Sequence, residues 1–169
     1  ASGVRRVDSV DQLGEAVSDA LSFDDAVIIE QWIDGVEVTV PVLGSGWDAY
    51  ALPPVEIVAK EGFCDTVACR TPGAVELFAP VRPASLSNDE ADAQAIRAEI
   101  ERAALEVCRA YQVRDLARVD LVWDGAQARV LEVDVSPSLA ESSPFSLACE
   151  ASGLSLSGVL NELVSQYAR

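Results

Sequence analysis

The feature that most constrains the fold is the dipeptide Asp-Gly between two apolar segments, which occurs at two unrelated places in the chain. Asp34-Gly35 lies between residues 26–33 and 36–43, and Asp124-Gly125 lies between residues 117–123 and 128–135. Asp-Gly is a preferred sequence for the tight turn that joins two antiparallel strands. The sequence therefore predicts two β-hairpins.

Further elements are predicted by apolar periodicity and by turn residues. Helices are expected over residues 9–22, 88–111, 144–152 and 155–167, with caps at Ser9 or Asp11, at Ser87 or Asn88, and at Gly153. Strands are expected around residues 50–58 and 75–79, the second within a long loop from residue 60 to residue 84. A chain of 169 residues, 50% of them hydrophobic, can bury a core. We expect a mixed sheet with helices packed on it.

Charge and cysteine usage narrow the class of protein. The formal net charge is -16, from 28 acidic and 12 basic residues, so we expect neither nucleic acid nor an anionic membrane as a partner. No apolar run approaches the roughly 20 residues that cross a bilayer, and the first residues lack the apolar core of a signal peptide. The four cysteines show no C-x-x-C spacing, so we interpret them as reduced thiols of a cytoplasmic protein.

Three carboxylates occupy the second predicted hairpin. Glu132 and Asp134 are two residues apart on one strand and project from the same face, and Asp120 lies on the neighbouring strand. Carboxylates that converge on one face repel each other unless a cation lies between them, and oxygen ligands suit magnesium. The alternative is the solvated face of an acidic protein.

The same hairpin carries a resemblance to a known family. The segments Arg118-Val-Asp120 and Leu131-Glu-Val-Asp-Val-Ser-Pro137 resemble the R-x-D … L-E-x-N-x-x-P-G signature of the D-alanine–D-alanine ligases, which belong to the ATP-grasp superfamily. The similarity continues to Ser155, and it extends upstream over residues 29–40 and 52–57. It implies an α+β fold with a mainly antiparallel sheet. Residues 1–35 would be the remnant of a central subdomain that ends at the adenine hinge, and residues 36–169 would be the C-terminal ATP-grasp subdomain.

The resemblance also implies a nucleotide site. Residues that would lie along the adenine are Glu30, Gln31, Trp32 and Ile33, and Glu37 would accept hydrogen bonds from the ribose hydroxyls. Without the resemblance, Trp32 and Ile33 would be interpreted as core residues. Asp120, Glu132 and Asp134 would bind the Mg²⁺ of ATP, or Mn²⁺ in its place.

Three further residues acquire candidate roles by resemblance. Arg118 would face the transferred phosphoryl group and the tetrahedral intermediate; its alternative is a salt bridge to a neighbouring carboxylate. Ser143 would bind the carboxylate of the second substrate, and a helix cap before Pro144 is compatible with that role. Ser138 belongs to the substrate-binding segment, where the family has glycine.

Other departures from the family concern charge. Asp134 replaces the usual Asn, and Cys69 stands where the family has a lysine that contacts ATP, with Arg70 beside it.

The family's N-terminal substrate domain and its earlier lysine strand have no counterpart, so we expect a fragment that is inactive alone and whose partner is the N-terminal half of the same protein.

The implied reaction joins two small-molecule amino acids with cleavage of ATP, and it would serve the synthesis of peptidoglycan precursors for the cell wall. A homodimer is a further partner that the resemblance allows. Two alternatives are a ligase for another amino-acid pair and a non-catalytic nucleotide-binding or scaffold domain.

Overall fold

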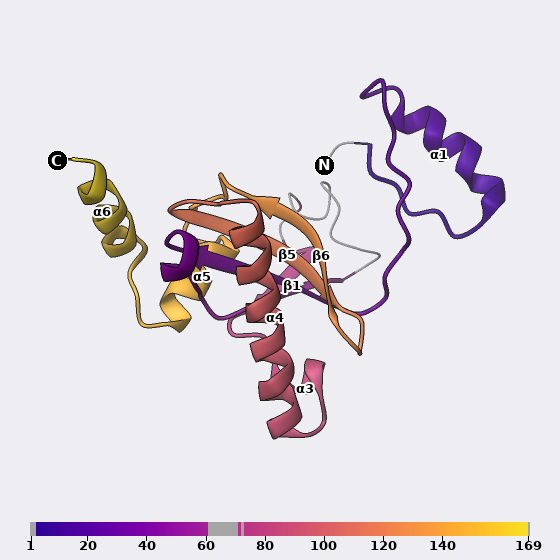
Figure 1. Cartoon of the computed structure of the whole chain (residues 1–169). Coiled ribbons are helices and arrows are strands. Elements are labelled where there is room, and N and C mark those ends of the chain that lie inside the picture. Colours follow the sequence, from indigo (N-terminus) through magenta and orange to yellow (C-terminus); the bar gives the residue numbers. More distant parts are fainter. Residues whose placement is uncertain (1–2, 61–70, 72, 169) are drawn as a thin grey trace. The chain divides into compact units, whose positions relative to one another are not determined.

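The computed structural model describes residues 3–60, 71 and 73–168 (Figure 1). The chain divides into two compact units, one formed by residues 1–33 and 59–76 and the other by residues 34–58 and 77–169. The assignment of residues 1–35 to a central subdomain and 36–169 to a C-terminal subdomain stays a prediction.

A mainly antiparallel sheet forms the centre of the larger unit. The strands in the described part of the chain are β1 (Val36–Leu43), β2 (Tyr50–Ala51), β3 (Val55–Ala59), β4 (Val75–Phe78), β5 (Leu116–Trp123) and β6 (Ala128–Asp134). Their order is β4-β3-β1-β5-β6, with β2 paired to β1. The β1–β2, β1–β3, β1–β5 and β5–β6 pairs are antiparallel. The expected α+β fold is confirmed, and so is the predicted β5–β6 hairpin.

The first predicted hairpin is wrong, because residues 26–33 form no strand. β1 pairs along its whole length with β5 on one side and with β2 and β3 on the other. Both edges of β1 are therefore occupied, and a preceding segment has no edge of β1 to join. The apolar side chains of Ile28 and Ile29 are 83% and 67% exposed, as expected for a segment that is not buried in a sheet.

The strand expected over residues 50–58 is present in two pieces. Pro53 and Pro54 separate β2 from β3. Proline has no N–H to donate to a neighbouring strand, so pairing stops there and resumes at Val55. The strand expected over residues 75–79 is β4, whereas the one-turn helix α3 (Pro83–Leu86) was not predicted.

The expected helices are present with shifted ends and caps. They are the 3-10 turn η1 (Val10–Gln12) with α1 (Leu13–Ala20), then α4 (Glu90–Ala110), α5 (Pro144–Ala151) and α6 (Leu156–Tyr167); a second 3-10 turn, η2, spans Gly46–Asp48. Asp89 caps α4 by accepting a hydrogen bond from the N–H of Asp92, so the predicted cap at Ser87 or Asn88 is wrong by two residues or by one. Gly153, at φ 74°, ends α5 as predicted. No helix in the described part of the chain is both long and apolar enough to cross a membrane.

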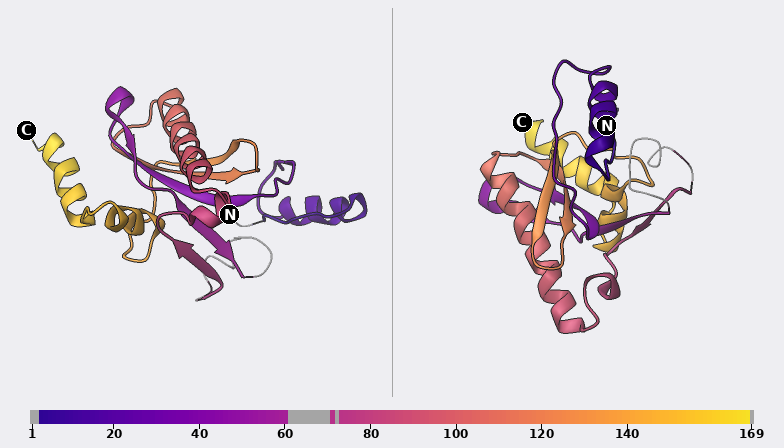
Figure 2. Two further views of the ribbon diagram at one scale, coloured as in Figure 1. Left: turned by 90° about the horizontal axis from the view of Figure 1, so that it is seen from below. Right: turned by 90° about the vertical axis from the view of Figure 1, so that its right-hand side faces the viewer.

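The two faces of the sheet pack against different helices. On one face, Val38, Val40 and Leu121 are buried with Ile100 and Ala104 of α4. On the other face, a second core contains Leu43, Leu52 and Val55 with Phe145 and Ala148 of α5. Figure 2 shows α4 and α5 on opposite sides of the strands. Two cysteines, Cys108 and Cys149, are buried free thiols in these cores.

Candidate functional site

The register of β1, β5 and β6 brings the predicted catalytic and metal residues together on one sheet face. Thr39 of β1 lies opposite Asp120 of β5, and Asp120 lies opposite Glu132 of β6. Arg118 lies opposite Asp134 in the same β5–β6 pair. Directly opposed residues share a face and have Cβ atoms about 4.5–5.5 Å apart. This is the face that α4 does not cover.

Asp120 is the most connected carboxylate of this group. Its Oδ1 accepts hydrogen bonds from the Thr39 hydroxyl at 2.5 Å and from Arg118 Nε at 3.0 Å. Its Oδ2 accepts a hydrogen bond from Arg118 Nη2 at 2.9 Å. The Asp120 side chain is 20% exposed. These bonds fix the carboxylate in one orientation on the sheet face.

Arg118 links two of the three predicted metal ligands. Besides its bidentate pair with Asp120, its Nη2 lies 3.6 Å from Asp134 Oδ2. The other oxygen of Asp134, Oδ1, accepts a hydrogen bond from the backbone N–H of Ser136 at 2.9 Å. The salt-bridge interpretation of Arg118 is therefore confirmed. Its role toward a phosphoryl group stays a prediction.

A shift in the β5–β6 register separates the site from the hairpin turn. Asp120 pairs with Glu132, but the next residue, Leu121, pairs with Val130, so Leu131 is an extra residue on β6. Such a β-bulge places two residues of one strand opposite one residue of the other. Glu132 and Asp134, which follow the bulge in β6, therefore point to the same face of the sheet as Asp120. Between the turn and the bulge, the side chains of β6 alternate between the two faces in the opposite phase.

Glu37 lies on β1 two residues before Thr39, on the same face. Burial, and to a lesser extent the negative charge of Asp120, together raise the pKa of Glu37 to about 7. A carboxyl group that titrates near neutrality can accept hydrogen bonds when ionised and donate one when protonated. Its predicted role toward ribose hydroxyls needs the accepting form.

The loop after β6 carries the predicted substrate residues. Ser143 caps α5: its Oγ accepts a hydrogen bond from the N–H of Ser146 and donates one to the Ser146 hydroxyl, both at 3.2 Å. The predicted helix cap is thus confirmed. Ser143 is only 6% exposed in this arrangement. Ser138 is exposed, and its Oγ accepts from the N–H of Ala140 at 3.4 Å.

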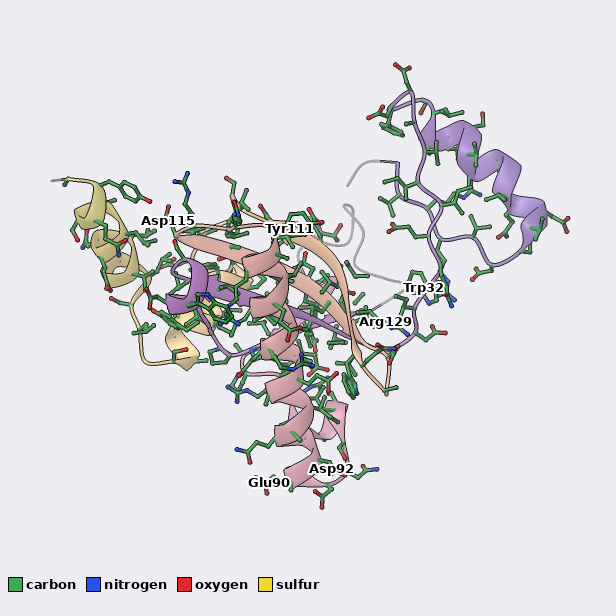
Figure 3. The ribbon with its side chains drawn as sticks, viewed as in Figure 1. Trp32, Glu90, Asp92, Tyr111, Asp115 and Arg129 are labelled. Carbon is green, nitrogen blue, oxygen red and sulfur yellow. The ribbon has the colours of Figure 1, made fainter. Side chains whose placement is uncertain are left out.

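The predicted adenine residues belong to the smaller unit and are described within it. The residues Glu30, Gln31 and Trp32 are exposed, and Ile33 is half-buried. The guanidinium carbon of Arg6 lies 4.3 Å from the centroid of a Trp32 ring, which is a cation–π contact (Figure 3). Trp32 is therefore not a core residue. Cys69 and Arg70 lie outside the described residues.

The donor set suits magnesium in kind, because Asp120, Glu132 and Asp134 all offer carboxylate oxygens. Among the described residues, however, no group of three or more Asp, Glu, Cys or His side chains is arranged to hold a metal ion. The guanidinium of Arg118 contacts two of the three carboxylates and supplies positive charge there. The assignment of these three residues as metal ligands stays a prediction.

Sequence reasoning missed Thr39. It is fully buried, and it donates to the central carboxylate of the site. Threonine is common in strands for steric reasons, so its presence in Val36–Leu43 carried no functional signal. Its position in the strand could have identified it, because Thr39 is two residues after Glu37 and side chains two apart in a strand point to the same face.

Comparison with solved structures identifies the class of fold. VanG D-Ala:D-Ser ligase from Enterococcus faecalis matches with a TM-score of 0.80 and 26% identity, over 98% of this chain and 46% of that chain. D-Alanine–D-alanine ligase from Bacillus anthracis, complexed with ATP, matches with a TM-score of 0.72 and 23% identity, over 95% of this chain and 49% of that chain. The fold is therefore that of the ATP-grasp class.

Comparison with sequences identifies the family within that class. The family model described as D-ala D-ala ligase C-terminus matches residues 1–165. D-Alanine–D-alanine ligase from Carboxydothermus hydrogenoformans is 33% identical over 168 residues, which cover 96% of this chain and 49% of the relative. The enzyme of the same name from Bordetella petrii is 33% identical over 167 residues, 98% of this chain and 48% of the relative. The chain belongs to the D-alanine–D-alanine ligase family and corresponds to its C-terminal half. It spans about half the length of the curated relatives that it matches.

Proposed function

We propose that this chain forms the ATP-binding and catalytic half of a carboxylate–amine ligase, with D-alanine as the favoured substrate. The observation that carries the proposal is the placement of Arg118, Asp120 and Asp134 on one sheet face, in ion-pair contact, at the positions of the family motif.

ATP and Mg²⁺ are the small molecules that this site would take. Asp120, Glu132 and Asp134 would hold the metal, and Glu37 with residues 30–33 would hold the nucleoside. Bound Mg²⁺ would neutralise the phosphate charge of ATP. The B. anthracis relative was solved in complex with ATP, which supports the nucleotide part of the proposal.

The proposed reaction has two steps. The carboxylate of the first amino acid takes the γ-phosphoryl group of ATP to give an acyl phosphate, and the amine of the second amino acid then displaces phosphate. Arg118 would stabilise the negative charge that grows on the oxygens in both steps, because its guanidinium is fixed by Asp120 before the substrate arrives. Ser143 would bind the carboxylate of the second substrate. Since no side chain acts as a nucleophile, the absence of histidine from the chain is no obstacle.

A second candidate is a ligase for a different pair of amino acids. It is favoured by the likeness to VanG, a D-Ala:D-Ser ligase, at a TM-score of 0.80 and 26% identity. Ser138, which replaces the family's glycine in an exposed position of the substrate loop, is a residue through which specificity would differ. The mass of the product formed from a mixture of D-alanine and D-serine separates the two candidates.

The proposal includes the rest of the protein. Relatives are about twice as long, so we propose that an N-terminal half completes the nucleotide and substrate clefts and that this chain alone has little or no ligase activity. We further propose a cytoplasmic location, as suits synthesis of a cell-wall precursor from ATP. Formation of D-alanyl-D-alanine by the isolated chain would contradict the proposed dependence on the other half.

The function is tested in the intact protein, as its cell makes it, by phosphate release and product mass with D-alanine, ATP and Mg²⁺. Asp120→Ala and Glu132→Ala are each expected to lower turnover at least about a hundredfold, because charge stabilisation of this kind contributes roughly that much. The matched control is Glu90→Ala, which removes an exposed carboxylate from the first turn of α4 (Figure 3). Turnover that is the same in all three variants would contradict the proposal.

A further inference from the structure

Thr39 makes a side-chain hydrogen bond to a carboxylate on the neighbouring strand. Its side chain is 0% exposed, and its hydroxyl donates to Asp120 Oδ1 at 2.5 Å across the β1–β5 pair. A buried hydroxyl must find an acceptor, and a bond to an ionised acceptor is shorter and stronger than one to a neutral group. The stiff β-branched side chain of threonine restricts where this donor can point.

The bonds to Asp120 restrict which of its lone pairs can bind anything else. A carboxylate offers about four acceptor positions, two on each oxygen. Thr39 Oγ1 and Arg118 Nε occupy both positions of Oδ1, and Arg118 Nη2 occupies one position of Oδ2. At most one acceptor position therefore remains, and it is on Oδ2. Thr39 and Arg118 together turn a symmetrical carboxylate into a ligand with one defined binding atom.

The two residues that donate hydrogen bonds to Asp120 differ in their burial and in their other contacts. Arg118 is 22% exposed and also contacts Asp134, so its guanidinium has an alternative partner within reach. Thr39 is fully buried on the central strand β1, which is paired on both edges. Thr39 is thus the more rigidly held of the two donors, and its hydrogen bond restrains the orientation of Asp120 together with that of Arg118.

We propose that Thr39 is a positioning residue for the metal site: it holds Asp120 Oδ1 so that Oδ2 is presented to the cation. This inference rests on the proposed function, in which Asp120 binds Mg²⁺. Groups that hydrogen-bond a metal ligand typically contribute about 10- to 100-fold to metal affinity.

The test uses the intact protein with Mn²⁺ and the non-hydrolysable analogue β,γ-imido-ATP, and it measures bound Mn²⁺ by the enhancement of water proton relaxation. Thr39→Val keeps the shape of the side chain and removes the hydroxyl, and we expect it to weaken Mn²⁺ binding about tenfold. Thr39→Ser keeps the hydroxyl, and we expect it to restore affinity to within about threefold of wild type. Asp120→Asn removes the negative charge of the proposed ligand, and its Mn²⁺ affinity shows how much binding is lost when the site is disabled.

A control separates positioning from general stability. Ser152→Ala removes a hydroxyl that donates to the Ala148 carbonyl at the end of α5, away from the carboxylates. Because Ser152 is exposed and Thr39 is fully buried, Ser152→Ala is expected to lower the melting temperature by less than Thr39→Val does and to leave Mn²⁺ affinity unchanged. Melting curves of all variants establish that each one is folded.

The outcomes distinguish this inference from the proposed function. If Asp120→Asn weakens Mn²⁺ binding and Thr39→Val does not, Thr39 has no positioning role and the metal site stands. If Asp120→Asn also leaves Mn²⁺ binding intact, the metal site itself is wrong and the inference falls with it. A Thr39→Ser variant as weak as Thr39→Val would overturn the role of the hydroxyl.

Discussion

The guanidinium of Arg82 forms a fork with the carboxylate of Glu56, with Nε 2.9 Å from Oε2 and Nη2 2.7 Å from Oε1. Glu56 is 3% exposed, and the backbone N–H of Arg82 also donates to it. Burial by itself would raise the pKa of Glu56, but the hydrogen bonds from Arg82 and Ser85 hold it below its ordinary value. The pair anchors β3 to the start of α3.

Removal of Arg82 should therefore be costly. Arg82→Met leaves a buried carboxylate without its cation, and we expect the free energy of unfolding to fall by about 3–5 kcal/mol in urea denaturation. Arg97→Met is the control, because it breaks the more exposed i,i+4 pair with Glu101 on α4 and should cost less than about 1 kcal/mol. Equal losses in the two variants would show that burial of Glu56 does not matter.

The raised pKa of Glu37 makes stability depend on pH. A folded-state pKa of about 7 against an ordinary 4.5 means that the folded chain binds more protons between these values, so this contribution to stability is complete below about 4.5 and is lost as pH rises through about 7. Glu37→Gln removes the effect. Measured in EDTA, the variant should gain on wild type by on the order of 1–3 kcal/mol between about pH 5 and about pH 8.5. A stability difference that stays constant over this range would contradict the shift.

The ion pairs of Arg118 predict a link between this residue and divalent cations. Arg118→Gln removes positive charge from between Asp120 and Asp134, and we expect metal-free protein to lose about 1–3 kcal/mol of stability. Mg²⁺ should recover much of that loss, since it would replace the missing charge. The measurement is the melting temperature as Mg²⁺ is titrated. Arg102→Gln, on an exposed pair with Glu106, should show no such recovery.

Two glycines should respond in opposite ways to the same substitution. A Cβ on Gly35 would lie 2.1 Å from the Trp123 carbonyl oxygen and 2.7 Å from Val122 Cγ1, so Gly35→Ala should push β1 away from β5 and cost at least about 2 kcal/mol. A Cβ on Gly14 has no atom within 4 Å among the described residues, and Gly14→Ala in α1 should stabilise by roughly 0.5–1 kcal/mol. Urea denaturation of the two variants checks both signs.

The β5–β6 hairpin could be predicted from sequence because local signals and the final structure agree there. Asp124 accepts from Arg129 and from the backbone N–H groups of Gln127 and Ala126, contacts that lower its pKa to about 2 and close the turn. Gly125 takes the positive φ of 92° that the turn requires. Each of these partners lies within five residues of Asp124 in the chain, so the local sequence was enough to predict the turn.

Residues 26–33 could not be predicted in the same way. Their β-branched residues favour a strand locally, but a strand forms only where a neighbouring strand has a free edge. The edges of β1 pair with other segments, and one of these pairs, Val36 with Trp123, joins residues 87 positions apart (123 − 36). The same limit applies to the site. A sequence motif was enough to select Arg118, Asp120 and Asp134. Thr39 belongs to no such motif, and only the structure shows that it bonds to Asp120, a residue 81 positions further along the chain.

The bulge at Leu131 sets the phase between the two ends of the β5–β6 hairpin, one carrying the carboxylates and the other the turn. Without it, a change of one residue in the length of β6 would turn Glu132 and Asp134 to the opposite face of the sheet. With it, the strand already absorbs one residue between the carboxylates and the turn. Deletion of Leu131 would remove the bulge and shift one end of β6 to the opposite face, so the number of residues in this strand is itself a requirement of the site.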